Sequence, residues 1–254
     1  MRDVIPTGTS RDSEFLFARM TEMTLDGVGP PAGRRILDVA SGFGQDAAAL
    51  VARGARVVAA EPSARMSALA RAVAAERPGA SPAWVRCWGD ALPFADARFD
   101  AVVCKGALDH FDRPEVAIAE MARVTRPGGR VVLAVANFES LAGRAARALD
   151  ALREGWLGRA PGRGRRHYDV PHDHFTRYEL ALLREQASRS LTLERVEGIS
   201  LGWGLAGWAR ALAALPATAA QGALAGLDWL ARRAPALADV VLLVGRPRSA
   251  STSA

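Results

Sequence analysis

Short β-type runs alternate with helical segments between residues 34 and 136, and this alternation limits the fold more than any other feature of the sequence. Gly54, Pro78-Gly79 and Pro127-Gly128-Gly129 end the three helical segments. Such alternation is typical of βαβ units that share a parallel sheet. We therefore expect strands at Ile36–Val39, Arg56–Ala60, Ala83–Trp88, Phe99–Cys104 and Arg130–Ala136, with helices at Gln45–Arg53, Ala64–Arg77 and Pro114–Thr125.

The remainder of the chain adds two strands and two insertions. β-type runs recur at Leu191–Glu197 and Asp239–Val244. Residues 201–238 are rich in Ala, Leu, Gly and Trp at helical spacing, which predicts a helical insertion. A second insertion spans residues 137–175, and a helix with Thr176 as N-cap and Glu179 closing a capping box should follow it.

These elements predict a single doubly wound α/β domain with a seven-stranded, mostly parallel sheet. The predicted domain covers residues 1–248, with its core at 34–136, and residues 249–254 are expected to be a disordered tail.

Composition agrees with a globular protein. The residues are 50% hydrophobic and 24% charged, and the net charge is +6, with Lys105 as the only lysine. This basic balance is weak evidence for a nucleic-acid, anionic-lipid or phosphorylated partner. Two cysteines do not make a disulfide framework, and charged residues interrupt Met1–Phe17, so we expect a cytoplasmic protein.

The strongest single motif is a strand that runs into a Gly-x-Gly turn at Ile36–Ala47. Glycines there let the backbone approach a ligand closely. The same spacing satisfies a dinucleotide fingerprint, so the motif alone leaves both NAD and S-adenosylmethionine (SAM) open. The predicted cofactor contacts on this turn are Asp38, Ala40, Gly42 and Gly44.

A carboxylate ends the second predicted strand. Glu61 stands about 20 residues after Gly42, where a carboxylate accepts hydrogen bonds from ribose hydroxyls in either kind of site. We expect Glu61 and the following Pro62 to contact the cofactor. The alternative role for Glu61 is that of an acid at a helix N-terminus.

A third set of motifs separates these alternatives. Gly89–Phe94, Arg98–Val103 and Arg123–Leu133 follow in order, and with the first two motifs they resemble the class I SAM-dependent methyltransferases over residues 34–136. The resemblance implies that SAM is the cofactor. It places Asp38 near the methionine end of SAM, Glu61 at the ribose, and Asp90 with Ala91 at the adenine; we also assign Lys105 to this site.

Three carboxylates at the carboxyl ends of parallel strands suit such a ligand. The SAM sulfonium is positively charged, whereas the pyrophosphate of a dinucleotide prefers amide donors and basic groups. The charges therefore favour SAM.

The acceptor is less well defined by the sequence. Cys104–His110 lacks the Asp/Asn-Pro-Pro-aromatic sequence of nucleic-acid amino methyltransferases, so we expect a small-molecule acceptor and O- or C-methylation. His110 is the candidate base, with a packing role as the alternative. The candidate substrate contacts are His167, Tyr168, His172 and His174; these histidines could also bind a metal, but we predict none.

The partners of the helical insertion stay open. Trp203, Trp208 and Trp229 with nearby arginines suit ordinary packing, a lid over an apolar substrate, a homodimer contact or a peripheral membrane contact. Residues 211–227 are uncharged but too weakly apolar to span a bilayer. The alternatives to a small-molecule enzyme are an RNA-directed methyltransferase, although nucleic acid is not the expected partner, and a non-catalytic SAM-binding regulator.

Overall fold

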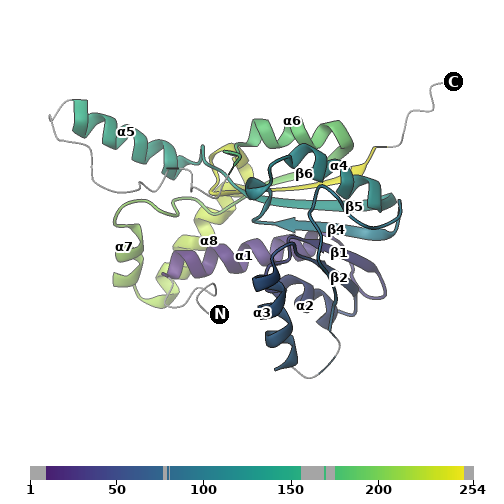
Figure 1. Cartoon of the computed structure of the whole chain (residues 1–254). Helices are drawn as coiled ribbons and strands as arrows, with labels where there is room; N and C mark the ends of the chain where they lie inside the picture. The colour runs from purple at the N-terminus through teal and green to yellow at the C-terminus, as the bar shows by residue number, and fades with distance from the viewer. Residues whose placement is uncertain (1–9, 77–78, 80, 156–168, 170–174, 249–254) are drawn as a thin grey trace.

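The computed structural model describes residues 10–76, 79, 81–155, 169 and 175–248 (Figure 1). Within this part of the chain, seven strands form one sheet in the order β3-β2-β1-β4-β5-β7-β6. β7 runs antiparallel to both of its neighbours, β5 and β6, and all the other neighbouring strands are parallel. The strands are β1 (Arg35–Val39), β2 (Arg56–Ala60), β3 (Ala83–Val85), β4 (Phe99–Lys105), β5 (Thr125–Ala136), β6 (Leu191–Ile199) and β7 (Val240–Pro247).

The helices are α1 (Arg11–Gly27), α2 (Gln45–Ala52), α3 (Ala64–Ala75), α4 (Pro114–Val124), α5 (Leu141–Gly155), α6 (Leu180–Ser190), α7 (Trp208–Ala214) and α8 (Ala217–Arg233), with short 3₁₀ turns η2 (Leu108–His110) and η3 (Pro235–Leu237). The predicted doubly wound, mostly parallel seven-stranded fold is confirmed.

Several predicted strand boundaries differ from the observed ones, among them the end of β3 and the start of β5, while β6 and β7 continue to Ile199 and Pro247, beyond their predicted ends. β3 ends at Val85 rather than at Trp88, whose side chain is 69% exposed and has no face of the sheet to pack on. β5 begins at Thr125 rather than at Arg130, because Thr125 already pairs with Phe99 of β4. The register between the two strands then shifts, and the next pair is Ala101 with Arg130.

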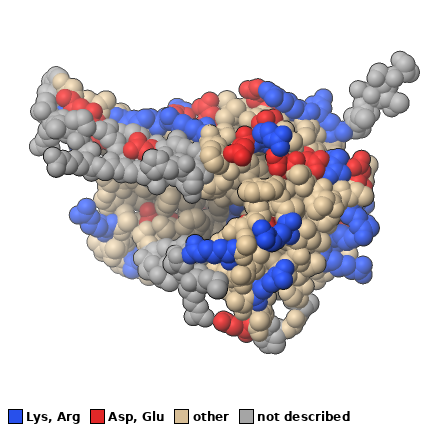
Figure 2. All heavy atoms as spheres, viewed as in Figure 1, with Lys and Arg blue, Asp and Glu red and all other residues tan. Residues whose placement is uncertain are grey.

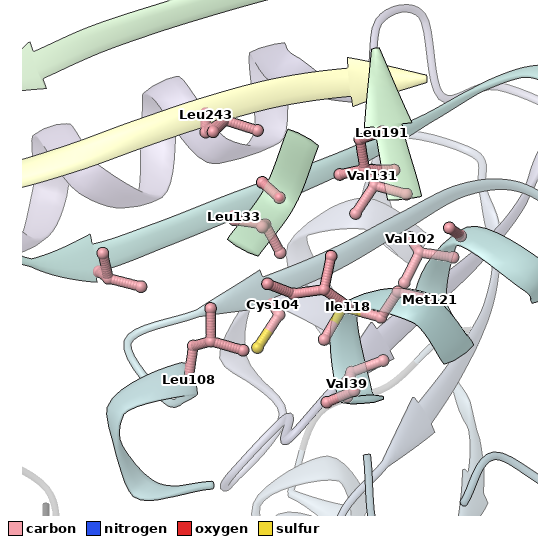
Figure 3. Close-up of a cluster of buried hydrophobic side chains, with 14 of the residues drawn as sticks. Val39, Val102, Cys104, Leu108, Ile118, Met121, Val131, Leu133, Leu191 and Leu243 are labelled. Atoms are coloured by element: carbon pink, nitrogen blue, oxygen red, sulfur yellow. The ribbon is translucent and has the colours of Figure 1, made fainter. Parts of the chain in front are cut away.

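The sheet buries a hydrophobic layer on each face. On one face Val102 and Cys104 of β4 and Leu133 of β5 meet Ile118 and Met121 of α4 (Figure 3). On the opposite face lie Ile36 of β1, Ala101 and Val103 of β4 and Val132 of β5, packed with residues of α1 and α2. Side chains of a strand alternate between faces, so strands buried on both sides read as continuous apolar runs.

Helix α1 was not predicted. Leu16, Met20 and Met23 follow the helical period and are all buried against the sheet. Gly27 lets the end of the helix approach closely, since a Cβ there would lie 2.9 Å from a methyl carbon of Val132. α1 thus covers the sheet beside α2.

The predicted helical insertion at residues 201–238 contains α7, α8 and η3. α8 lies beside α1 (Figure 1) and is tied to it by Asp228, whose carboxylate accepts a hydrogen bond from Arg19 Nε at 3.0 Å. The other insertion contains α5, which extends away from the body of the molecule in Figure 1.

The predicted capping box at Thr176 was wrong. α6 begins at Leu180, and Glu179 is its N-cap residue. The backbone N–H groups of Phe175 and Thr176 instead donate to the carbonyl oxygen of Asp109, at 2.8 and 3.2 Å, which holds this stretch against η2 in a non-helical conformation. The predicted tail at 249–254 lies outside the described residues. Among the helices of the described chain, none is long and apolar enough to cross a membrane.

Candidate functional site

The Gly-rich turn after β1 is tightly packed. Ala40, Gly42 and Gly44 all have positive φ angles, of 55°, 56° and 78°. A Cβ at Gly44 would come within 2.3 Å of the Trp84 ring, so only glycine fits there. The Ser41 N–H donates to the Ala60 carbonyl, which holds the turn against the end of β2.

Asp38 lies buried at the end of β1, with 3% of its surface exposed. Burial raises its pKa well above the usual range, and the nearby Asp46 carboxylate raises it further, while Lys105 and the Ala47 backbone N–H act in the opposite direction. Its Oδ2 atom has no hydrogen-bond partner among the described residues. A positively charged ligand at this point would satisfy that oxygen and stabilise the ionised carboxylate.

Lys105, at the end of β4, joins three elements around Asp38. Its Nζ donates to Thr21 Oγ1 of α1 and to the Asp46 carboxylate of α2, each at 2.7 Å. The side chains of Lys105 and Asp46 are only 12% and 6% exposed. Sequence reasoning found Lys105 but neither of its partners, because they are 84 and 59 residues away along the chain.

Glu61 ties the end of β2 to the Gly-rich turn. One carboxylate oxygen accepts the Gly42 N–H and the other accepts the Ser63 N–H, both at 2.9 Å. The side chain is buried, and each oxygen keeps a further lone pair for a ligand hydroxyl. Met66 of α3 lies beside this point, since its methyl carbon is 3.5 Å from where a Cβ of Gly42 would lie.

Asp90 lies in the turn after β3, where Arg113 Nη2 donates to its carboxylate at 2.6 Å. This ion pair is partly open to solvent, with side-chain exposures of 63% for Arg113 and 22% for Asp90. Gly89 receives the Phe111 ring, which would lie 2.6 Å from a Cβ at that position. Sequence reasoning missed Arg113 and Phe111, which come from the loop after β4.

The structure thus brings the predicted cofactor residues to one edge of the sheet. Asp38 and Lys105 lie at the carboxyl ends of β1 and β4, Glu61 and Asp90 follow β2 and β3, and neighbouring parallel strands end at the same edge. The remaining predicted contacts lie on the same turns: Ala40, Gly42, Gly44, Pro62 and Ala91. Buried carboxylates beside a glycine turn fit a cationic adenosine-bearing ligand such as SAM.

His110 lies at the end of η2, directly after β4, and is half-buried. Its backbone N–H donates to the Ala107 carbonyl at 3.0 Å, which orders the turn. The four predicted substrate contacts His167, Tyr168, His172 and His174 lie outside the described residues. Within the described chain, no group of three or more His, Cys, Asp or Glu side chains is arranged to hold a metal ion.

Comparison with known proteins identifies the motif region. Residues 37–133 match the family described as "Methyltransferase domain". An uncharacterised methyltransferase of Mycobacterium leprae is 42% identical over 104 residues, covering 41% of this chain and 38% of the relative. A demethylmenaquinone methyltransferase of Renibacterium salmoninarum is 36% identical over 132 residues, covering 52% of this chain and 51% of the relative.

The match to these curated relatives therefore spans about two-fifths to half of their length. Solved structures extend the similarity in fold to nearly the whole chain. The PH0226 protein of Pyrococcus horikoshii superposes with a TM-score of 0.61 at 18% identity, covering 97% of this chain and 98% of that protein. At this identity the likeness concerns the fold.

Proposed function

We propose that the chain transfers a methyl group from SAM to a small-molecule acceptor, on the basis of the match of residues 37–133 to the methyltransferase domain family. The observation that carries the proposal is the buried Asp38 carboxylate, whose Oδ2 has no hydrogen-bond partner among the described residues. A buried, unsatisfied carboxylate oxygen is costly, and a cationic ligand would remove that cost.

The residues of the site divide between the parts of the cofactor. Bound SAM supplies a methyl group already activated by the sulfonium. We assign Asp38 to its ammonium group, Glu61 to the ribose hydroxyls and Asp90 to the adenine amino group, as the family resemblance implies. Gly42 and Gly44 keep the turn open to the ligand backbone, and Phe111 offers an apolar ring beside Asp90.

The ion pair of Lys105 with Asp46 also organises the site. It holds α1 and α2 together over the end of β4 and places one positive charge near Asp38. We therefore propose that Lys105 orders the methionine end of the site and reaches the cofactor carboxylate. A lysine that is almost fully buried and twice hydrogen-bonded is well oriented for that role.

We propose an apolar small molecule as the acceptor, methylated at oxygen or carbon. The demethylmenaquinone methyltransferase relative supports this class, since its name specifies a demethylated quinone and it is 36% identical to this chain over 132 residues. The proposed acceptor contacts remain His167, Tyr168, His172 and His174 from the segment before Phe175. Phe175 itself is bonded to η2, so the described end of that segment lies against the turn that carries His110.

His110 is the proposed general base for an acceptor that must lose a proton. It follows β4 at the same edge of the sheet as Asp38. Methyl transfer itself requires mainly orientation of the two reactants, so a base contributes only by removing the acceptor proton. His110→Ala should therefore lower kcat and leave SAM affinity unchanged; equal kcat in the variant would reduce His110 to a packing residue.

The decisive experiment is calorimetric titration of the protein with SAM, S-adenosylhomocysteine and NAD, followed by incubation with SAM and demethylmenaquinone. We expect saturable heats with the first two ligands only and release of S-adenosylhomocysteine when the acceptor is present. The control variant for His110→Ala is Glu185→Gln, which changes an exposed acid on α6. Binding of NAD alone, or of none of the three, would contradict the cofactor assignment; SAM binding without turnover on any apolar acceptor would favour the non-catalytic alternative.

A further inference from the structure

A second charged pocket lies at the opposite edge of the sheet. It has a volume of about 200 Å³ and is lined by Arg34, Arg126, Arg130 and Arg246, together with Asp100. Arg34 directly precedes β1, Arg126 and Arg130 lie in the first half of β5, and Arg246 lies near the end of β7. Because β7 is antiparallel to β5, these positions meet at the amino edge of the parallel strands.

The pocket carries more positive than negative charge. Asp100 forms an ion pair with Arg126, with Nε 2.7 Å from Oδ1, and its Oδ2 accepts a hydrogen bond from the Arg35 backbone N–H, also at 2.7 Å. Glu194 is shared by Arg130, at 3.4 Å, and Arg246. The Arg34 side chain forms no ion pair with any described carboxylate, and its Nη1 donates to the Val28 carbonyl, at 3.1 Å. Four guanidinium groups thus face two carboxylates.

Two of these guanidinium groups converge on one point. A Cβ at Gly29 would lie 2.9 Å from Arg130 Nη1 and 3.5 Å from Arg34 Nη1. The two nitrogens are therefore no farther apart than the sum of those distances, and no side chain at residue 29 separates them. The two guanidinium groups repel each other at this range, and of the two only Arg130 pairs with a described carboxylate, that of Glu194, so an anion bound between them would lower the repulsion.

We propose that this pocket binds a small phosphoryl anion such as phosphate or pyrophosphate. Guanidinium groups donate paired N–H groups to phosphate oxygens, and a dianion would match the two excess positive charges. The cavity is smaller than the roughly 300–1,000 Å³ typical of sites for drug-sized ligands, which agrees with a compact anion. In Figure 2 basic side chains also gather at the right-hand end of the molecule, where Figure 1 shows β4 and β5 beginning.

The site is separate from the cofactor site, because the strands lie between them. A bound anion would cross-link the start of β1, the start of β5 and the end of β7. These strands also carry or support Asp38 at their other edge, so the anion would stabilise the sheet without entering the methyl-transfer site. The proposal does not depend on the proposed activity.

The test is calorimetric titration with pyrophosphate and with inorganic phosphate at 100 mM NaCl, using the full chain. We compare the wild type with Arg34→Gln, Arg130→Gln and the double variant. Arg189→Gln, an exposed arginine of α6 paired with Glu185, is the matched control. We expect saturable binding, about ten-fold weaker in each single variant, absent in the double variant and unchanged in the control. Near-ultraviolet circular dichroism of each variant checks that the fold is intact.

Binding that is equal in all variants, or that never saturates, means an adventitious ion only and overturns the proposal. Binding to vesicles that contain phosphatidic acid, lost in the double variant and without any binding of pyrophosphate, would overturn the free anion and assign a lipid headgroup instead. Loss confined to the pocket variants supports the proposal.

Discussion

The two edges of one sheet carry opposite charges in different surroundings. At the carboxyl edge Asp38, Glu61 and Asp239 are 3%, 7% and 5% exposed. At the amino edge the side chains of Arg126 and Arg246 remain 50% and 46% exposed. Water screens the exposed charges, whereas burial couples the others to protonation and ligand binding. Removing one charge should therefore change stability and ligand affinity much more at the carboxyl edge than at the amino edge.

The largest effect is expected for Lys105→Met. The substitution leaves the buried Asp46 carboxylate without its ion-pair partner, which typically costs about 3–5 kcal/mol of stability. Chemical unfolding at neutral pH measures the loss. The double variant Lys105→Met/Asp46→Leu should recover most of it, because no buried charge is then unpaired; a single variant as stable as the wild type would show that the pair is solvated after all.

Asp239 should give the protein a pH dependence. It directly precedes β7 at the carboxyl edge, and burial raises its pKa to about 6 despite hydrogen bonds from Trp203, Ser200 and Gly202. The folded state therefore binds an extra proton between the ordinary carboxyl pKa and about 6. Its contribution to stability is present at low pH and is lost as the pH rises through that window.

Asp239→Asn should remove this decline and make the protein more stable than the wild type at pH 7.5, by up to about 3 kcal/mol. Unfolding free energies at pH 4.5 and 7.5 in both proteins provide the measurement. Since other carboxylates titrate in both proteins, only the difference between them is compared. If the two proteins lose stability in parallel over this range, Asp239 is not the responsible group.

Asp38→Asn should separate stability from binding. The change removes a buried charge whose pKa is raised well above the usual range, so the protein should unfold no more easily. SAM affinity should nevertheless fall by about 1–3 kcal/mol, the cost of a lost charge-assisted hydrogen bond. In the wild type the affinity should also increase with pH as Asp38 ionises, and in the variant this increase should be absent.

Calorimetry at several pH values, with Glu185→Gln as the control, tests this prediction. Affinity for SAM that stays at the wild-type value in Asp38→Asn would remove Asp38 from the site. A fall in stability without a change in affinity would make the residue structural.

The acids of the carboxyl edge were predictable because each is fixed by local pattern. A β-type run followed by a turn places Asp38, Glu61 and Asp90 at strand ends, and parallel strands bring those ends together whatever the rest of the chain does. The Lys105–Asp46 pair was not predictable, since it depends on the register of α2 against β4. α1 was not predicted, because its apolar residues form a buried stripe only where they pack against the sheet.

The capping-box error has the same physical origin. The spacing of Thr176 and Glu179 satisfies the local rule, but hydrogen bonds from Phe175 and Thr176 to Asp109, far away in the sequence, hold the chain in another conformation. The arginines of the amino-edge pocket were likewise not predictable from the sequence, because they come from the residue before β1, from β5 and from β7, and meet only in the folded sheet.

The smallest effect is expected for Arg126→Gln at the amino edge. Its ion pair with Asp100, at 2.7 Å, is half-open to water, and such pairs contribute about 0–1 kcal/mol. Asp100 also keeps its hydrogen bond from the Arg35 N–H, so no buried charge is left unpaired. The free energy of unfolding should therefore fall by less than about 1 kcal/mol at 50 mM NaCl, and the difference should shrink further at 500 mM NaCl. A loss as large as that of Lys105→Met, or one insensitive to salt, would show that the amino edge is electrostatically buried like the carboxyl edge and would break the contrast between them.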